Sequence, residues 1–366
     1  MTDPKVLVTG ATGFIAGHCI EELLGHGYAV RGTVRNAATA NVAHLHAIAR
    51  RTGGSLEFAE ASLDDDAGWG KALDGCTYLW HLASPVPARL PKDEAELIRP
   101  AVDGTLRVLR AATDSGTVRR VVMTSSTDAI VHGHPQTDRV RTETDWSDPG
   151  RLAPYPKSKL HAERTAWDFA ANHPLELVTI NPGLVLGPLQ RKQQNTSMEV
   201  VRLLLARKLP AVPRLSFAVA DVRDIAAAHR LAMETPGAAG NRYICAGPAL
   251  WMGDIADILH TAFGPHGYRV PTRTLPYWLM WAGARFDKTA RLALSYYGVP
   301  VLVSADKARQ ELGWVPRPAS ESIIAAAESM IRYGIVPRRG RRKPATEAAS
   351  NAHPSALRRT RGPSGV

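Results

Sequence analysis

Cysteine is scarce in this 366-residue chain, and long apolar runs are missing. The three cysteines, Cys19, Cys76 and Cys245, show no CxxC spacing. An odd, scattered set argues against a disulfide framework and is typical of buried free thiols in a reducing compartment. No uninterrupted apolar stretch reaches the roughly 18 residues of a membrane-spanning helix. The first apolar segment also lacks the charged flank of a secretion signal. We therefore expect a cytoplasmic protein without a membrane span.

Acidic residues are outnumbered, 34 against 45 basic ones, which gives a net charge of +11. The excess is concentrated at the C-terminus, because residues 338–366 carry eight Arg and Lys side chains against the single acid Glu347. That segment is rich in Pro, Ala, Ser and Arg without apolar periodicity, so we expect a disordered basic tail. The remaining chain is only mildly basic, and we expect no nucleic-acid partner.

Metal-binding patterns are also missing, since the thirteen histidines form no HExxH or similar cluster. We therefore expect no metal site. The composition is otherwise that of a globular protein, with 45% hydrophobic and 22% charged residues. A chain of this length can bury a large core and form two closely joined lobes.

The most informative segment is an apolar strand, Val6–Val8, that leads into a turn with Gly10 and Gly13 and then into a helical pattern. Small residues allow a close approach of the backbone to a phosphate. The free N–H groups of the new helix and its positive dipole end then face the negative charge. Glycine turns also occur for other reasons, but the following helix and a second strand near 28–34 favour a dinucleotide-binding unit.

The end of that second strand distinguishes NAD from NADP. NAD-binding folds usually place an acidic residue there to bind the ribose hydroxyls. This chain has Arg35 at about that position, and its guanidinium suits a 2′-phosphate. Arg31 or a residue of the following loop could supply the contact instead. The sequence therefore predicts NADP(H) as the cofactor.

Tyr155 and Lys159 are four residues apart and share one face of a predicted helix. A free phenol has a pKa of about 10. A neighbouring ammonium group favours the phenolate and lowers that pKa, so the pair could act in acid–base catalysis. Upstream, the strand near 119–125 ends at Ser125 and Ser126. A serine there lies at the cofactor crevice of an open α/β sheet and could hold a carbonyl oxygen beside the tyrosine.

Strand and helix patterns alternate from residue 5 to about 181, which predicts an α/β fold of the Rossmann type, with a doubly wound parallel sheet. We expect strands near 6–9, 28–34, 55–60, 77–83, 119–125 and 175–181. A long helix should span about 93–115, and a further strand 243–245. Residues 220–225 are expected to return to the sheet, with Asp221 or Asp224 capping a helix.

These patterns divide the chain into two lobes and a tail. Residues 1–187 plus about 217–246 should form the NADP-binding Rossmann domain, and about 188–216 plus 247–337 a smaller, mostly helical substrate-binding lobe. The tail is 338–366. The lobe contains four tryptophans, which we expect in its core rather than as a substrate platform: Trp251, Trp278, Trp281 and Trp314.

Several motifs together resemble one family over about residues 4–337. They are Val8-Thr9-Gly10-Ala11-Thr12-Gly13-Phe14-Ile15, His81-Leu82-Ala83-Ser84-Pro85, Thr124-Ser125-Ser126, Tyr155-Pro156-Lys157-Ser158-Lys159, Asn181-Pro182-Gly183-Leu184-Val185-Leu186-Gly187-Pro188 and Arg242-Tyr243-Ile244-Cys245. The chain resembles an extended short-chain dehydrogenase/reductase of the NAD-dependent epimerase/dehydratase superfamily, of the dihydroflavonol reductase and cinnamoyl-CoA reductase type. The run Phe14-Ile15-Ala16-Gly17-His18 resembles the microbial aldehyde and ketone reductases more than the plant flavonoid enzymes.

The resemblance implies that Tyr155 is the acid–base group, that Lys159 tunes it and binds the nicotinamide ribose, and that Ser126 orients the carbonyl. The expected cofactor contacts are Arg35, inferred above from its position, together with Tyr155, Lys159 and the further residues that the resemblance implies. The others are Gly10, Thr12, Gly13, Phe14, Ile15, Ser62, Leu63, Leu82, Ala83, Ser84, Pro182, Val185 and Ser197. Two positions depart from the pattern: Ala16 replaces a glycine, and Ser62 replaces an aspartate that commonly holds the adenine. His81 should pack beneath the cofactor loop.

The expected function is NADPH-dependent reduction of an aldehyde or ketone, reversible as alcohol oxidation. The partners would be small-molecule carbonyl or alcohol substrates, and the protein a monomer or homodimer. The alternatives on this scaffold are a nucleotide-sugar epimerase or dehydratase and a steroid-type dehydrogenase. A non-enzymatic NADP-sensing protein would have no need for the Tyr155–Lys159 pair.

Overall fold

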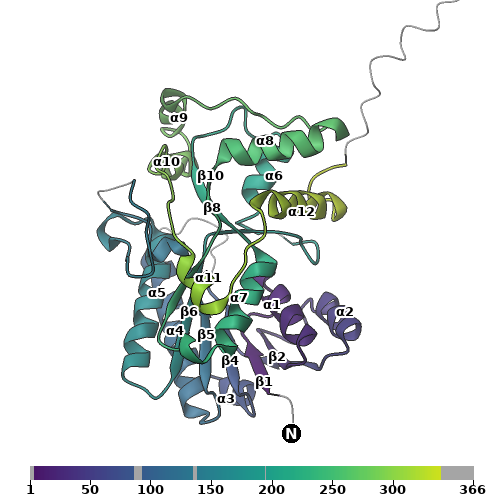
Figure 1. Ribbon diagram of the computed structural model, residues 1–366, viewed down its shortest axis with the longest axis vertical. Coiled ribbons are helices and arrows are strands. Elements are labelled where there is room, and N and C mark those ends of the chain that lie inside the picture. Colours follow the sequence, from purple (N-terminus) through teal and green to yellow (C-terminus); the bar gives the residue numbers. More distant parts are fainter. Residues whose placement is uncertain (1–3, 86–92, 135–137, 194, 339–366) are drawn as a thin grey trace, which may run out of the picture.

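The computed structural model describes residues 4–85, 93–134, 138–193 and 195–338. Its centre is a seven-stranded sheet in which all strands run parallel, in the order β3-β2-β1-β4-β5-β6-β9 (Figure 1). The bounds are β1 Lys5–Val8, β2 Ala29–Val34, β3 Leu56–Glu60, β4 Tyr78–His81, β5 Arg120–Thr124, β6 Glu176–Pro182 and β9 Arg242–Cys245. This confirms the predicted Rossmann-type sheet and, within one to two residues, most of its strands.

Helices cover both faces of the sheet because its strands are apolar on both sides. One face is covered by α1 (Phe14–Gly25), α2 (Ala43–Thr52), α7 (Val222–Glu234) and α11 (Asp306–Leu312), whose apolar side chains share one core. The other face is covered by α3 (Trp69–Leu73), α4 (Ala95–Asp114) and α5 (Pro154–Ala171). The predicted long helix is α4. All three cysteines are buried free thiols, as expected.

Residues 220–225 do not return to this sheet, and that prediction is wrong. They contain the end of β8 (Ser216–Asp221), which pairs with β7 (Leu184–Leu186) and β10 (Ala249–Trp251) in a separate three-stranded sheet. The chain leaves the large sheet immediately after β6, because β7 belongs to the small sheet. Gly183 joins the two strands, and β8 passes so close to it that a Cβ atom would lie 1.9 Å from the Ala218 carbonyl oxygen. The capping prediction holds for Asp221, which accepts a hydrogen bond from the Arg223 N–H at the start of α7.

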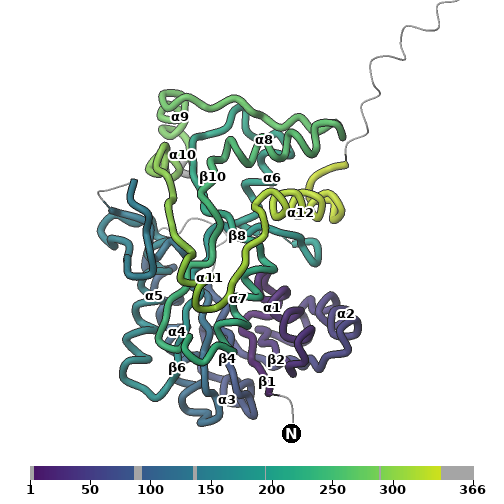
Figure 2. The backbone as a smooth tube through the Cα atoms, viewed as in Figure 1, coloured from purple at the N-terminus to yellow at the C-terminus, as the bar shows by residue number. Residues whose placement is uncertain are grey.

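A second apolar core lies beyond the large sheet. It is built from the small sheet with α6 (Glu199–Leu205), α8 (Met252–Phe263) and α12 (Ala319–Arg332). Figures 1 and 2 show these helices, with α9 (Tyr277–Gly283) and α10 (Lys288–Leu294), gathered at the end of the molecule opposite the N-terminus. The strands run toward this end, so the second core stands over their carboxyl ends.

The tryptophans of this region do not behave alike. Trp314 is buried, and its indole N–H donates to the Asp224 carbonyl oxygen. Trp278 and Trp281 are 66% and 47% exposed, so the prediction that these two lie in the core is wrong. Both belong to α9, a helix of seven residues that buries only Met280 among its side chains. The predicted basic tail lies outside the described residues, except for Arg338.

Candidate active site

The turn between β1 and α1 has the geometry expected of a phosphate-binding loop. Gly10 has a φ of +65°, and a Cβ atom there would lie 3.2 Å from the Ala83 Cβ. Glycine is thus required both by the left-handed backbone and by the close approach of the β4 loop. Gly13 is the N-cap of α1, and no side chain caps the helix. The first N–H groups of α1 therefore remain available to an anion.

Thr9 ties this turn to the neighbouring loop. Its hydroxyl accepts hydrogen bonds from the Leu82 and Ala83 N–H groups, both at 2.9 Å, and lies 3.1 Å from the His81 Nδ1. These two bonds use both lone pairs of the oxygen, so the hydroxyl donates its single proton to the imidazole. Burial, with a further effect of Lys159, lowers the pKa of His81 to about 3, so the ring stays neutral. His81 therefore packs beneath the loop of Leu82, Ala83 and Ser84, as predicted.

Arg35 and Arg31 have different environments. Arg35 follows the last residue of β2 and is exposed. Arg31 forms an ion pair with Glu57 and donates to the carbonyl oxygens of Lys71, Ala72 and Asp74. Of the two, only Arg35 is free to meet a ligand phosphate. The structure also brings a carboxylate that the sequence did not reveal, since Glu60 accepts the Ala37 N–H at 2.6 Å.

The remaining predicted cofactor residues lie along the carboxyl ends of the strands. Ser62 and Leu63 directly follow β3, and Leu63 packs against Gly104 of α4. Pro182 ends β6, and Val185 is a buried residue of β7. Ser197 is more distant in the chain, in the segment before α6, where its N–H donates to the Asn195 side chain.

The three predicted catalytic residues come from two adjacent elements. Ser126 follows β5 and caps a short 3-10 helix, η1 (Thr127–Ala129), by accepting the Asp128 N–H at 3.1 Å. Tyr155 lies in the first turn of α5, which packs against η1. The Lys159 Nζ is 5.9 Å from the centroid of the Tyr155 ring. The structure thus supports the placement of Tyr155 and Lys159 on one helix face.

The electrostatics of the tyrosine differ from the prediction. Burial raises the pKa of the Tyr155 phenol above its usual value, and the Asp128 carboxylate raises it further. The residue as a whole is 38% exposed. Burial also lowers the pKa of Lys159, while Asp128 and Glu163 oppose that shift. The net shift at Tyr155 is therefore upward, opposite to the direction expected from Lys159 alone.

Asp128 is the charged neighbour that the sequence analysis missed. Its Oδ1 lies 2.9 Å from the His132 Nε2, and the His132 ring packs against Tyr296 with centroids 5.0 Å apart. Burial opposes the ionisation of Asp128, but hydrogen bonds with His132 and Ser126 and the charges of His132 and Lys159 together outweigh burial, so the pKa of Asp128 is lowered. A carboxylate therefore stands beside the Tyr155–Lys159 pair.

A buried network supports the same region. The Glu163 carboxylate, one turn after Lys159, accepts hydrogen bonds from Ser125, Thr179, Asn181 and Arg242. The Asn181 side chain also donates to the Ser126 carbonyl oxygen at 3.2 Å. The only feature of the sequence that pointed to a role for Glu163 in this region was its four-residue spacing from Lys159. The partners of Glu163 come from β6, from β9 and from the residue that follows β5, which local spacing does not place together.

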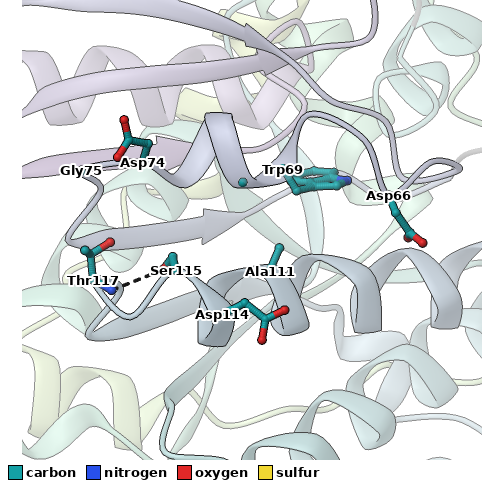
Figure 3. A pocket seen from close by; sticks show the side chains of 9 residues that line it. Asp66, Trp69, Asp74, Gly75, Ala111, Asp114, Ser115 and Thr117 are labelled. Carbon is teal, nitrogen blue, oxygen red and sulfur yellow. Dashed lines mark hydrogen bonds between the residues drawn. The ribbon is translucent and has the colours of Figure 1, made fainter.

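One surface pocket lies away from this region, between α3 and α4 (Figure 3). Asp74 and Gly75 precede β4, and Asp114 and Ser115 precede β5. Part of its lining thus belongs to the amino ends of the strands, opposite the glycine turn and the catalytic residues. Among the described residues, no group of histidine, cysteine or acidic side chains could hold a metal ion.

The family model for the NAD dependent epimerase/dehydratase family matches residues 6–246. Cinnamoyl-CoA reductase 1 from Petunia hybrida is 37% identical over 332 residues, covering 86% of this chain and 95% of that protein. The putative anthocyanidin reductase of Ginkgo biloba is 33% identical over 286 residues, covering 73% and 82%. A fold with a dinucleotide turn and a Tyr–Lys helix defines a nucleotide-dependent enzyme of the extended short-chain dehydrogenase/reductase type. The chain belongs to the NAD dependent epimerase/dehydratase family.

Solved structures agree with this assignment. The yeast methylglyoxal/isovaleraldehyde reductase Gre2, complexed with NADPH, superimposes with a TM-score of 0.74 at 25% identity, covering 90% of this chain and 99% of that one. Gre2 from Candida albicans in complex with NADPH gives a TM-score of 0.72 at 28% identity, with the same coverage. No helix in the described part of the chain is long and apolar enough to cross a membrane.

Proposed function

We propose that this protein reduces an aldehyde or ketone with NADPH and oxidises the corresponding alcohol in the reverse direction. The reductase relatives and the NADPH-bound neighbours make the chain an NADP(H)-dependent oxidoreductase of the extended short-chain family. The proposal of carbonyl reduction rests on the arrangement of Tyr155 and Lys159 on α5, which packs against the helix that Ser126 caps.

The cofactor fits the residues present. The uncapped N-terminus of α1 faces the glycine turn, in which Gly10 lies close to Ala83 with a left-handed backbone. These N–H groups would hold the pyrophosphate, and Arg35 the 2′-phosphate. When bound, the reduced nicotinamide supplies a hydride. We propose that all the cofactor contacts expected from the sequence are made in the complex with NADP(H).

The chain's own residues supply the rest of the chemistry. The Ser126 hydroxyl donates a hydrogen bond to the substrate oxygen and fixes its position. Tyr155 gives its phenolic proton to that oxygen as negative charge develops there. The positive charge of Lys159 stabilises the phenolate that remains. In the reverse direction the phenolate accepts the proton of the alcohol.

We further propose two lobes, a Rossmann domain of residues 1–187 plus about 217–246 and a substrate-binding lobe of about 188–216 plus 247–337, with the substrate held between them. The small sheet contributes to both cores, and α11 packs back on the large sheet. This second core stands over the carboxyl ends of the strands, the usual place for a ligand in an open α/β sheet. The three buried thiols fit a reducing compartment such as the cytoplasm. The protein would act there as a monomer or homodimer.

The test is a panel of aldehydes and ketones, with NADPH oxidation followed for the wild type and for Tyr155→Phe. We expect turnover of at least one carbonyl class, and a loss of roughly 10²-fold or more in the variant. Tyr268→Phe is a matched control, because the Tyr268 hydroxyl bonds the Pro337 carbonyl oxygen in the other core. Activity on a UDP-sugar with none on any carbonyl compound would replace the reductase assignment by an epimerase or dehydratase.

A further inference from the structure

Arg191 reaches the glycine turn from a loop that the sequence analysis did not connect with the cofactor. Its Nη2 donates a hydrogen bond of 2.7 Å to the Thr12 carbonyl oxygen, within the turn between β1 and α1. Arg191 lies in the loop after β7, and 179 residues of sequence separate it from Thr12. The fold thus places a guanidinium group directly beside the N-terminus of α1.

The loop that carries Arg191 is fixed to α1. The His18 Nε2 lies 2.9 Å from the Pro188 carbonyl oxygen, and the Gln190 side chain donates to Glu21 at 2.7 Å. Tyr333, just beyond α12, donates its hydroxyl proton to the Gln190 carbonyl oxygen at 2.8 Å. Three contacts at two residues of the loop, Pro188 and Gln190, hold the arginine in place, so its position next to Thr12 is defined by the fold.

The charge of Arg191 has no partner in the described part of the chain. None of the ion pairs there includes it, and its buried Nε has no hydrogen-bond acceptor. Burial lowers the pKa of this guanidinium. The nearby Glu21 carboxylate is engaged by Gln190 and Arg51 instead. A partly buried cation with an unused donor is unfavourable by itself and is stabilised when an anion arrives.

His44 at the start of α2 is part of the same environment. Its buried Nδ1 also lacks a hydrogen-bond partner. Burial lowers the pKa of His44 to about 4, and the charges of Arg191 and His18 contribute to that shift. The ring is therefore neutral at neutral pH, so of these two residues only Arg191 carries a positive charge.

We propose that Arg191 binds the pyrophosphate of the dinucleotide, opposite the N–H groups of α1. The proposal rests on the use of NADP(H) by this protein. It differs from the role proposed for Arg35, which follows β2 and would meet the 2′-phosphate. The pyrophosphate is common to NADPH and NADH, whereas the 2′-phosphate is not. The two arginines therefore have separable effects on binding.

The experiment measures direct binding of NADPH, NADH and ADP-ribose to the full chain by calorimetry. Arg191→Gln should weaken all three by roughly ten- to a hundredfold, the usual scale for a charge-assisted contact with a phosphate. Arg191→Lys should restore part of the loss, because it keeps the charge without the forked geometry. Lys192→Gln, which alters the exposed neighbour, should bind all three as the wild type does.

Three outcomes overturn the proposal: unchanged binding in Arg191→Gln, a loss confined to NADPH, or a loss that is the same in the Lys variant. The ligand-free unfolding temperature of each variant is measured alongside. If Arg191→Gln does not fold, the decision passes to the equally uncharged Arg191→Met, whose wild-type affinity for ADP-ribose would contradict the proposal. These readouts need no carbonyl turnover, so binding by a wild type that reduces nothing would refute the proposed function alone.

Discussion

Glu163 and Arg242 form a buried ion pair, with 2.7 Å between the Oε1 of the carboxylate and the Nε of the guanidinium. The pair joins α5 to β9, the edge strand of the large sheet. Glu163 is completely buried, and the Arg242 guanidinium also stacks on Trp146 at 3.7 Å from the ring centroid. Because Glu163 also bonds Ser125 and Asn181, the pair supports the strand end that carries Ser126.

We therefore expect Glu163→Gln to destabilise the fold by about 3–5 kcal/mol, since it leaves the Arg242 charge buried and uncompensated. The free energy of unfolding in denaturant measures this. Glu199→Gln is the matched control, because Glu199 pairs with Arg202 at the same 2.7 Å while both side chains are partly exposed, at 45% and 33%. Its expected loss is below about 1 kcal/mol. Equal losses in the two variants would contradict a special role for the buried pair.

Lys159 and Lys157 offer a second matched comparison on one helix. Lys159 lies beside Tyr155, whereas Lys157 forms an ion pair with Glu94. We expect Lys159→Ala to lower kcat by roughly 10²-fold and to weaken NADPH binding, because in the proposed function the ammonium group would act on both the phenol and the ribose. Lys157→Ala should retain near-wild-type values. Steady-state kinetics and cofactor titration of both variants test this, and similar losses in both would refute the assignment.

Arg35 should determine the choice of cofactor. Arg35→Ala removes the exposed guanidinium that follows β2, so NADPH should bind roughly ten- to a hundredfold more weakly while NADH changes little. Added salt should reduce the wild-type preference, because the contact is partly screened by solvent. Michaelis constants for both cofactors measure the effect. An equal loss for NADH and NADPH would mean that Arg35 supports the fold or the adenine instead.

Asp128 should set the pH dependence of the reaction. The Asp128 carboxylate raises the pKa of Tyr155 and faces Lys159, His132 and Tyr296. Asp128→Asn removes one negative charge and should lower that pKa. Alcohol oxidation needs the phenolate, so its rising limb should move to lower pH. Carbonyl reduction needs the phenol, so its decline should also begin at lower pH.

The profiles of kcat/KM against pH in both directions test this prediction. Asp148→Asn serves as a control, because Asp148 bonds the same segment through its N–H to the His132 carbonyl oxygen. Its carboxylate accepts the Gly150 N–H instead. A shift of the same size in both variants, or none in Asp128→Asn, would show that Asp128 does not act on Tyr155.

The sequence predicted what depends on local patterns. The glycine turn, the alternation of strands and helices and the i, i+4 pair on α5 are each encoded within a few residues. Residues 220–225 were misplaced because an apolar strand does not specify its partner, and β8 pairs within a second sheet. Arg191, Glu163 and Asp128 were missed because their partners lie on other elements. A spacing of 179 residues between Thr12 and Arg191 leaves no local signal.

The central claim is that a hydride passes from the reduced cofactor to a carbonyl carbon. The most direct measurement uses NADPH carrying deuterium on both positions of nicotinamide C4, with any carbonyl compound that the panel identifies. Mass spectrometry and NMR then locate the label in the product. We predict one deuterium on the carbinol carbon for each NADPH consumed. NADPH consumption with no deuterium on that carbon would contradict the account.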